Sequence, residues 1–449
     1  CSRVGLVLLR SRHFHLHMPR PMDLLLELSW RGLIHQTTDD ERLPKWLAEG
    51  SRKVYAGFDP TADSLHVGSM VPLLMLRRFQ KAGHQPIILI GGATGMIGDP
   101  SGKSEERNLL SVDVLQNNVA ALELQMRQFL DFDDSATAAE LVNNHDWLKE
   151  VGYLDFLRDV GKSFPVGVMM GKDSVRSRLQ REEGGMSYTE FSYMLLQAYD
   201  FVYLNERFGC ELQVGGSDQW GNITAGIDLA RRLRAVQLYG LTHPLLTKSD
   251  GTKMGKTEQG AIWLAPERTS PYQFYQYWFR VEDADVGHCL RMLTDLAREE
   301  IESLDSARLA DASKHESQRR LAEEMTRVVH GPSGLETARR ATEVFFGGEI
   351  QPQQQDDGQL KEIFEDVPSE ELPRERLAGD GLSVVDSLVL SGLCQSKGAA
   401  RRTIQQGGAY VNNRRVQGID TQLSTTDLAS PSIMVLRTGK KNYALLRFV

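Results

Sequence analysis

Apolar and polar positions follow one another in a strand, helix, strand order through the first part of the chain. The apolar segment 53–58 predicts a short strand, and the turn residues of 59–64 follow it. The apolar-rich segment 67–81 predicts a helix, and 86–90 predicts a second, buried strand. Two strands joined by a helix of this length predict a right-handed βαβ unit, which begins a parallel nucleotide-binding sheet.

The same alternation continues further along the chain, so the expected fold class is α/β. We expect a helix around 188–199, a strand near 212–214 and a helix from about 222 to 234. A first helix opens at Met22-Asp23, ahead of the sheet. Between 270 and 346 the sequence is mostly helical and highly charged, which predicts an α-helical domain after the sheet domain.

The charge changes sign towards the C-terminus. From Gly348 to Gly381 there are ten acidic and three basic residues, and a glutamine-rich run lies within this segment, which predicts a linker. Residues 382–449 carry nine lysines and arginines against three aspartates. Their pattern predicts a small α+β module, with a helix, a basic helix and a hairpin over 411–416. A basic module on an acidic body is typical of a nucleic-acid contact; the alternative is a solvated charged face.

These patterns divide the chain into five parts. We expect a leader (1–21), a Rossmann-like catalytic domain (22–265), a helical domain (266–346), an acidic linker (347–381) and a basic α+β module (382–449).

Composition excludes several other classes of protein. The chain has 449 residues, 41% hydrophobic and 25% charged, so it is neither disordered nor collagen-like. Its net charge of −8 argues against coating nucleic acid with the whole surface. No apolar run reaches the ~18–20 residues of a membrane-spanning helix. The four cysteines, which lie far apart without a C-x-x-C pair, predict a reducing compartment and neither a disulfide framework nor a zinc site: Cys1, Cys210, Cys289 and Cys394.

The leader is rich in arginine and free of acids, and two interpretations stand. It is either a disordered tail from a mis-assigned start, since Met18 and Met22 are both plausible starts, or a mitochondrial transit peptide. The localisation expected is the bacterial cytoplasm, or the mitochondrial matrix under the second interpretation.

Residues 91–104 form a glycine-dense turn after the second strand and end in Gly-Lys-Ser. A phosphate-binding P-loop needs four residues between its glycines, whereas Gly98 and Gly102 are separated by three. The turn instead lets backbone approach a ligand closely and holds Asp99 on a loop.

The strongest signal is a pair of distant segments. In 59–69, a strand-to-helix turn presents His66 at a helix N-terminus, where free amides and the helix dipole favour phosphate. In 253–257, Lys253 and Lys256 flank a glycine within a flexible loop. A histidine at an anion-binding helix start and a mobile lysine loop suit a nucleotide whose α-phosphate is attacked while pyrophosphate leaves. Taken alone, His66 is also interpretable as a core histidine or helix cap, and the lysines as an exposed loop.

The pair resembles the HIGH and KMSKS motifs of class I aminoacyl-tRNA synthetases. Residues 55–64 and Gly215-Gly-Ser-Asp-Gln-Trp-Gly-Asn222 resemble the bacterial and organellar tyrosyl-tRNA synthetases in particular, and the resemblance extends from Met22 to Val449. Ser69 stands where the family motif has a second histidine; its hydroxyl can donate a hydrogen bond but cannot be cationic. Gly255 and Thr257 replace the serines of the lysine motif.

A tyrosine site can also be argued from the residues. A site rejects phenylalanine when its polar groups need the missing hydroxyl, a principle for which this enzyme family is itself the standard example. Tyr193, Gln197 and Asp200 share one face of the predicted helix, although an amphipathic helix facing solvent gives the same pattern. The resemblance gives Tyr55 and Asp200 to the phenolic hydroxyl. The implied tyrosine-binding residues are Tyr55, Asp99, Tyr193, Gln197, Asp200 and Gln213.

The resemblance also implies roles on the nucleotide and RNA sides. The implied ATP-binding residues are Gly57, Asp59, His66, Ser69, Gly216, Asp218, Gln219 and Lys256. The implied catalytic residues, which contact the phosphates or close over pyrophosphate, are His66, Lys253, Lys256, Thr257, Lys103 and Arg107. Residues 382–449 resemble the small αL-type RNA-binding module that ribosomal and pseudouridine-synthase proteins share, and the implied RNA contacts are Lys397, Arg401, Arg402 and Arg414.

The resemblance therefore implies a homodimeric ligase that activates L-tyrosine with ATP and transfers it to the 3′ end of tRNA(Tyr). Mg²⁺ is expected to accompany ATP, with no tightly bound protein metal and no membrane partner. Two alternatives remain. A tryptophanyl-tRNA synthetase shares the fold, although the Tyr55 and Asp200 pair argues against it. A non-catalytic RNA-binding paralogue has only Ser69 in its favour.

Overall fold

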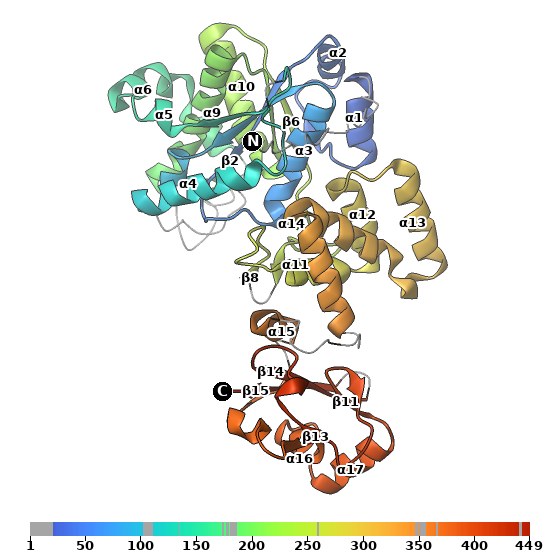
Figure 1. Ribbon diagram of the computed structural model, residues 1–449. Helices are drawn as coiled ribbons and strands as arrows, with labels where there is room; N and C mark the ends of the chain where they lie inside the picture. The colour runs from blue at the N-terminus through green and yellow to red at the C-terminus, as the bar shows by residue number, and fades with distance from the viewer. Residues whose placement is uncertain are drawn as a thin grey trace, which may run out of the picture. The chain divides into compact units, whose positions relative to one another are not determined.

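The computed structural model describes residues 21–101, 111–133, 135–172, 175–176, 179, 186–257, 260–345, 350, 356–364, 367–439 and 442–449, with backbone alone at 21–23, 256, 257 and 345. The chain divides into two compact units, which we describe separately (Figure 1). The first unit runs to Arg268 and includes Glu282–Ser317. The second contains Thr269–Val281 and the chain from Gln318 onward.

A six-stranded sheet forms the centre of the first unit, in the order β1-β6-β5-β2-β3-β4. The strands are β1 (Gln36–Thr37), β2 (Lys53–Phe58), β3 (Gln85–Ile90), β4 (Glu140–Asn143), β5 (Leu212–Gly216) and β6 (Tyr239–His243). All neighbours pair in parallel except β1, which lies antiparallel to β6 at one edge. The chain passes from β2 to β3 on one side and returns to β5 on the other. The carboxyl ends of β2 and β5 therefore form a topological switch point, where open α/β sheets bind ligands.

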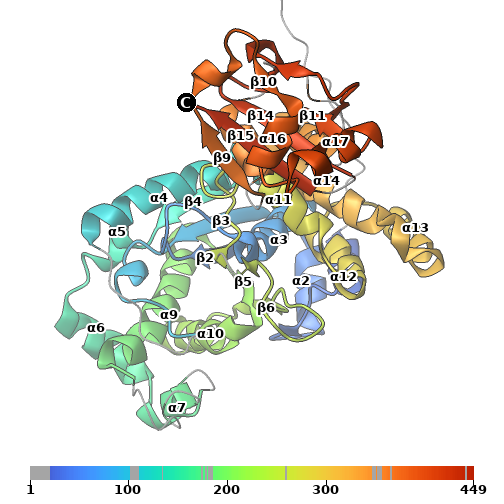
Figure 2. The ribbon, with the colours of Figure 1, turned by 90° about the horizontal axis from the view of Figure 1, so that it is seen from below.

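Helices cover both faces of this sheet. The helix α3 (Met70–Lys81) packs on β2, β3 and β5, while α10 (Trp220–Arg234) packs on β5 and β6 beside α9 (Tyr188–Phe208). In Figure 2 the strands lie between α3 and the pair α9 and α10. Tyr55 and Ile87 are fully buried in the core beneath α9 and α10. The predicted strands and helices of the βαβ unit and its continuation are thus confirmed, as is the α/β class.

The remaining helices of the first unit lie around this core. They are α1 (Pro21–Trp30), α2 (Arg42–Ala48), α4 (Val112–Met126), α5 (His145–Leu148), α6 (Tyr153–Asp159), α7 (Val166–Met170), α12 (Asp283–Leu293) and α13 (Arg298–Ala310). The two-stranded β7 (Lys256–Thr257) and β8 (Gly260–Ala261) follow the lysine motif. Helix α9 extends beyond its predicted end because Gly209, with φ of 69°, supplies the left-handed residue that terminates it.

The predicted helical domain is divided between the two units. Helices α12 and α13 belong to the first unit, whereas α11 (Pro271–Phe279) and α14 (Glu316–Phe345) belong to the second. Helix α14 is kinked at Gly331, which has φ of 70°, and Pro332 follows it. Proline has no N–H to continue the helical hydrogen bonds, so the helix bends there.

The C-terminal part of the second unit contains a five-stranded sheet, a two-stranded sheet and the helices α15, α16 and α17. The sheet order is β12-β11-β14-β15-β9, and β10 pairs with β13. Its elements are α15 (Asp357–Ile363), β9 (Ser369–Leu372), β10 (Leu382–Ser383), α16 (Val384–Leu390), α17 (Lys397–Gln405), β11 (Ala409–Val411), β12 (Arg414–Arg415), β13 (Gln422–Leu423), β14 (Ile433–Thr438) and β15 (Asn442–Phe448). The predicted hairpin is present: Asn412 and Asn413 both have positive φ, as a two-residue turn requires.

The acidic segment 347–381, predicted as a linker, contains folded elements. Strand β9 pairs in parallel with β15, and α15 buries Leu360 and Ile363 in the core of the second unit. The acids of β9 lie on its exposed positions, while Leu372 is buried. The segment contains ten acids, and the apolar positions of these short elements are too few to form a recognisable pattern among them. The net charge therefore predicted a linker where the structure has a helix and a strand. The leader lies outside the described residues.

Candidate active site

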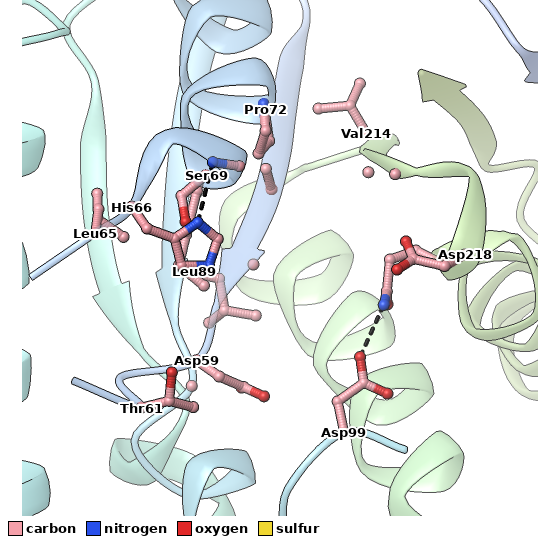
Figure 3. A pocket seen from close by; sticks show the side chains of 18 of the residues that line it. Asp59, Thr61, Leu65, His66, Ser69, Pro72, Leu89, Asp99, Val214 and Asp218 are labelled. Atoms are coloured by element: carbon pink, nitrogen blue, oxygen red, sulfur yellow. Dashed lines mark hydrogen bonds between the residues drawn. The ribbon is translucent and has the colours of Figure 1, made fainter. Parts of the chain in front are cut away.

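A cavity of about 610 Å³ lies at the carboxyl ends of β2 and β5, at the switch point of the sheet. Its walls come from the β2–α3 turn, the glycine-dense turn after β3, helix α9, the β5–α10 turn, the end of β6 and the lysine loop. Figure 3 shows His66 and Ser69 of the β2–α3 turn across the pocket from Asp218 of the β5–α10 turn. The predicted residues that line it are Tyr55, Gly57, Asp59, His66, Ser69, Asp99, Tyr193, Gln197, Asp200, Gln213, Gly216, Asp218, Gln219 and Lys253. Segments some 200 residues apart in sequence thus meet in one cavity.

The tyrosine and carboxylate pair is buried at one end of the cavity. Tyr55 is 0% exposed and Asp200 is 1% exposed. Within the described residues, the Tyr55 hydroxyl has no hydrogen-bond partner. Burial raises the pKa of Asp200 to about 7, against the opposing effect of the hydrogen bonds that it accepts. An unpartnered hydroxyl beside a buried carboxyl is suited to a ligand that carries a hydroxyl.

Two residues that the sequence analysis missed hold this carboxyl. The indole Nε1 of Trp147 donates to Asp200 Oδ1 at 2.8 Å, and Asn144 Nδ2 donates to Asp200 Oδ2 at 3.0 Å. Asn144 also accepts the backbone N–H of Ala93 at 2.8 Å, so it ties the glycine-dense turn to the pair. Both follow the carboxyl end of β4, whose residues are all half-buried, so no apolar strand in the sequence marked them.

Carboxylates and amides cluster beside this pair. Tyr193 Oη donates to Asp59 at 3.3 Å, and Gln219 Nε2 donates to Asp99 Oδ2 at 2.7 Å, the contact drawn in Figure 3. Burial and the charges of Asp59, Asp99 and Asp200 raise the pKa of Tyr193 well above its usual value. Three carboxylates around one buried phenol make a negative field, which favours a cation such as an ammonium group.

The amide side chains here share a further partner. Asn222, which is buried, donates through Nδ2 to Gln197 Oε1 at 3.0 Å and to Gln219 Oε1 at 3.2 Å. It lies within the Gly215–Asn222 motif, but the motif did not assign it a role. Another cavity residue missed from sequence is His243 at the end of β6; its Nε2 has no partner within the described residues.

His66 is the N-cap of the short helix Val67–Ser69, in another wall of the cavity. Its Nδ1 accepts the backbone N–H of Gly68 at 3.0 Å, so the proton of the neutral ring lies on Nε2. A Cβ at position 68 would lie 2.8 Å from the His66 ring, which explains why glycine stands there. Because Nδ1 accepts this bond, Nε2–H is the donor group of the ring. Ser69 lines the same wall but makes no side-chain cap hydrogen bond.

The lysine loop faces this wall. Gly255 has φ of 83°, and a Cβ there would come within 3.1 Å of Val67 in the His66 turn. Lys253 and Met254 line the cavity. Burial and the charge of Asp99 raise the pKa of Asp218, whereas Lys253 lowers it, so a lysine and two carboxyl groups act on one another across the cavity. The backbone of Lys256 and Thr257 continues into β7. Lys103 and Arg107 lie outside the described residues.

The predicted RNA contacts lie in the second unit. Lys397, Arg401 and Arg402 are exposed on α17, and Arg414 is exposed on β12. Lys397 pairs with Asp386 at 2.7 Å.

Two features are absent from the described residues. They contain no group of three or more His, Cys, Asp or Glu side chains placed to hold a metal ion. None of the helices in this part of the chain is long and apolar enough to cross a membrane.

Comparison with known proteins gives the class to which this fold and site belong. Residues 48–347 match the family model of class I tRNA synthetases (W and Y). The chain belongs to this family. Residues 359–446 match the model of the C-terminal domain of SYY-like tyrosine–tRNA ligases.

The individual relatives are named as tyrosine–tRNA ligases. That of Rhodopirellula baltica is 58% identical over 94% of this chain and 96% of its own length. That of Roseiflexus castenholzii is 52% identical over 95% of this chain and 99% of its own. Among solved structures, the C-terminally truncated mitochondrial tyrosyl-tRNA synthetase of Aspergillus nidulans has a TM-score of 0.64 and 32% identity, covering 72% of this chain and 94% of that chain.

Proposed function

We propose that the chain is a tyrosine–tRNA ligase, which activates L-tyrosine with ATP and transfers it to the 3′ end of tRNA(Tyr). The names and coverage of the relatives support this function. The observation that carries it is the single cavity that joins the buried Tyr55 and Asp200 pair to the His66 turn and the lysine loop.

The first reaction forms tyrosyl-adenylate. A carboxylate oxygen of tyrosine attacks the α-phosphorus of ATP, the bond from that phosphorus to the bridging oxygen breaks, and pyrophosphate leaves with its electrons. In the second reaction the terminal ribose hydroxyl of the tRNA attacks the tyrosyl carbonyl. AMP leaves, and the hydroxyl proton is released. No protein nucleophile is needed, so catalysis depends on positioning and on charge stabilisation.

The buried pair sets the amino-acid specificity. The phenolic hydroxyl of tyrosine donates to Asp200 and accepts from the hydroxyl of Tyr55. Phenylalanine would leave the Tyr55 hydroxyl buried and unpaired and would deprive Asp200 of one hydrogen bond, and a site of this kind rejects it by ~10⁴–10⁵-fold. Gln213, whose Oε1 is buried without a partner in the described part of the chain, borders the same end. The side chains of Asp99, Tyr193 and Gln197 bind the substrate ammonium.

The opposite wall binds ATP. Nε2 of His66 donates to the phosphates, with Ser69 beside it, and Lys253, Lys256 and Thr257 stabilise the charge that develops on departing pyrophosphate. Lys103 and Arg107 close over pyrophosphate, as the resemblance implies. The adenosine part is bound by Gly57, Asp59, Gly216, Asp218 and Gln219. Mg²⁺ enters with ATP as part of the substrate.

Two partners follow from the rest of the chain. The basic residues Lys397, Arg401, Arg402 and Arg414 contact the phosphates of the tRNA. A second copy of the chain covers exposed apolar side chains on α6, α7 and the start of α9, of which Leu154 is 78% exposed. Leu154→Asp should convert a dimer to a monomer in light scattering; a wild-type mass of one chain would contradict the dimer.

The compartment is the bacterial cytoplasm, since the relatives at 58% and 52% identity are bacterial. Fusing residues 1–21 to a reporter tests the alternative. Import of the reporter into mitochondria would assign the enzyme to the matrix instead.

Tyrosine-dependent ATP–pyrophosphate exchange tests the function. We expect exchange with tyrosine and none with phenylalanine or tryptophan at equal concentration. Asp200→Asn should lose the preference for tyrosine over phenylalanine while ATP KM stays nearly unchanged. Exchange with tryptophan alone would assign the chain to the other branch of the family. Tight tRNA binding without any exchange would favour a non-catalytic role.

A further inference from the structure

The segment 260–268, here called the connecting segment, joins the two motif regions of the active site. Its Ile262 donates to the carbonyl of Gly255 in the lysine loop at 2.9 Å and accepts from the N–H of Val67 at 3.0 Å. Leu264 donates to Leu65 at 2.8 Å, and Trp263 forms an antiparallel bridge with His66. The connecting segment is therefore hydrogen-bonded to both motif regions.

A chain of side-chain contacts leads from this segment to the His66 ring. The Trp263 ring lies edge-on to His66, with centroids 6.2 Å apart and an interplanar angle of 66°. The guanidinium carbon of Arg268 lies 4.1 Å from the Trp263 ring centroid. Arg268 Nε also pairs with Asp63 Oδ1 at 3.0 Å, in the turn that precedes His66. Asp63, Arg268 and Trp263 thus bracket His66 from its own turn and from the connecting segment.

We propose that Trp263 and Arg268 are positioning residues that hold the His66 imidazole towards the ATP phosphates, an inference that rests on the proposed function. His66 is exposed at the cavity, and rotation about its side-chain bonds would swing the ring away from the Nδ1 hydrogen bond. The indole edge limits that swing. Arg268 holds the indole through its face, and Asp63 anchors Arg268 to the turn that His66 follows.

This arrangement does little for folding. The Arg268 and Asp63 side chains are 38% and 59% exposed, and exposed ion pairs contribute little to stability. The contacts surround a ring that needs one orientation for the reaction, so their effect should appear in the rate of adenylate formation.

The test compares Arg268→Ala with a matched control elsewhere in the same unit. Arg298 makes the same two contacts: it lies 5.1 Å from the Trp30 ring centroid and pairs with Glu302 at 2.8 Å. We expect Arg268→Ala and Trp263→Phe to slow single-turnover tyrosyl-adenylate formation about three- to tenfold. Tyrosine KM and the melting temperature should stay unchanged. Arg298→Ala should match the wild type, and Arg268→Lys should retain most of the rate.

A double-mutant cycle separates positioning from a general effect. In a His66→Asn background, Arg268→Ala should cause no further loss, because the ring that it positions is gone. An equal loss in that background would overturn the proposal, as would an Arg268→Ala rate equal to that of the Arg298→Ala control. If the wild-type enzyme forms no tyrosyl-adenylate, the proposed function is refuted. That outcome differs from the two that would overturn the positioning role of Trp263 and Arg268.

Discussion

The substitution Trp147→Phe tests whether Asp200 must be ionised to bind the substrate hydroxyl. It removes the donor at 2.8 Å from Asp200 Oδ1 and keeps an aromatic ring in place. The indole is stacked on Tyr203 with centroids 4.4 Å apart, a contact that phenylalanine largely preserves. The substitution is therefore selective for the hydrogen bond.

The magnitude follows from the pKa of Asp200, which burial raises to about 7 despite the hydrogen bonds from Asn144 and Trp147. A hydrogen bond to a charged group is worth about 1.5–3 kcal/mol, so its loss should move this pKa to about 8–9. At pH 7.5 the ionised fraction of Asp200 then falls from about three quarters to about a tenth. Tyrosine binding should weaken about tenfold or slightly less at that pH and recover towards pH 9.

The assay is ATP–pyrophosphate exchange with tyrosine and phenylalanine between pH 6 and 9. Phenylalanine shares the ammonium group, so the ratio of the two kcat/KM values isolates the hydroxyl. Trp46→Phe is a matched control, because the Trp46 ring also packs against a tyrosine, Tyr239, with centroids 4.7 Å apart and an interplanar angle of 34°, and Trp46 lies outside the cavity lining. If the ratio of kcat/KM for tyrosine to that for phenylalanine is the same in Trp147→Phe and in the wild type at every pH, the reasoning is refuted. A loss that is equal at every pH would show that packing, and not ionisation, is responsible.

Three further changes test other parts of the molecule. Burial raises the pKa of Asp295, but Arg77, Arg78 and Lys81 lower it more, to about 2. Because this folded-state pKa lies below the unfolded value, its stabilisation is present above about pH 4 and lost between about pH 4 and 2. Asp295→Asn should lower the free energy of unfolding, measured in urea, by about 2 kcal/mol at pH 7 and by much less near pH 2. The control Asp228→Asn, which removes an exposed ion pair, should lower it little. An equal loss for Asp295→Asn at both pH values would contradict this. Lys253→Ala should lower the activation rate with little change in tyrosine KM, and a pure rise in that KM would count against its role with the phosphates. Removing residues 347–449 should leave pyrophosphate exchange intact and reduce both tRNA charging and the salt dependence of tRNA binding; undiminished charging would give the module another role.

The truncation before residue 347 differs from one placed at the end of the acidic segment, which the charge distribution alone would suggest. A cut after Gly381, at the predicted end of the linker, would keep β9 and remove β15, the strand with which it pairs. The sequence predicted the basic module and its hairpin because both depend on local signals, a helix N-terminus and a two-residue Asn-Asn turn. It did not predict β9, because a four-residue strand with two acids gains its order from a partner more than seventy residues away.

The active site shows the same division between local and distant information. The strand, turn and helix around His66 follow from a short stretch of sequence, and so does the face that Tyr193, Gln197 and Asp200 share on α9. Trp147 and Asn144 reach Asp200 across more than fifty residues of chain, and nothing in their own neighbourhood marks them. Asn222 stood inside a recognised motif, yet its contacts with two amides become visible only once α9 and α10 pack together.

The two ends of the cavity meet opposite physical demands. Under the proposed function, rejecting phenylalanine requires Tyr55 and Asp200 to be buried and held, because an unpaired polar group is costly only where water cannot replace its partner. Releasing pyrophosphate requires the other end to open, and there His66 is exposed and the lysine loop turns at Gly251 and Gly255, both with positive φ. A loop that opens gives no fixed frame for the histidine. Under the proposed function the connecting segment supplies one, because its hydrogen bonds to Val67 and Leu65 reach the His66 turn directly.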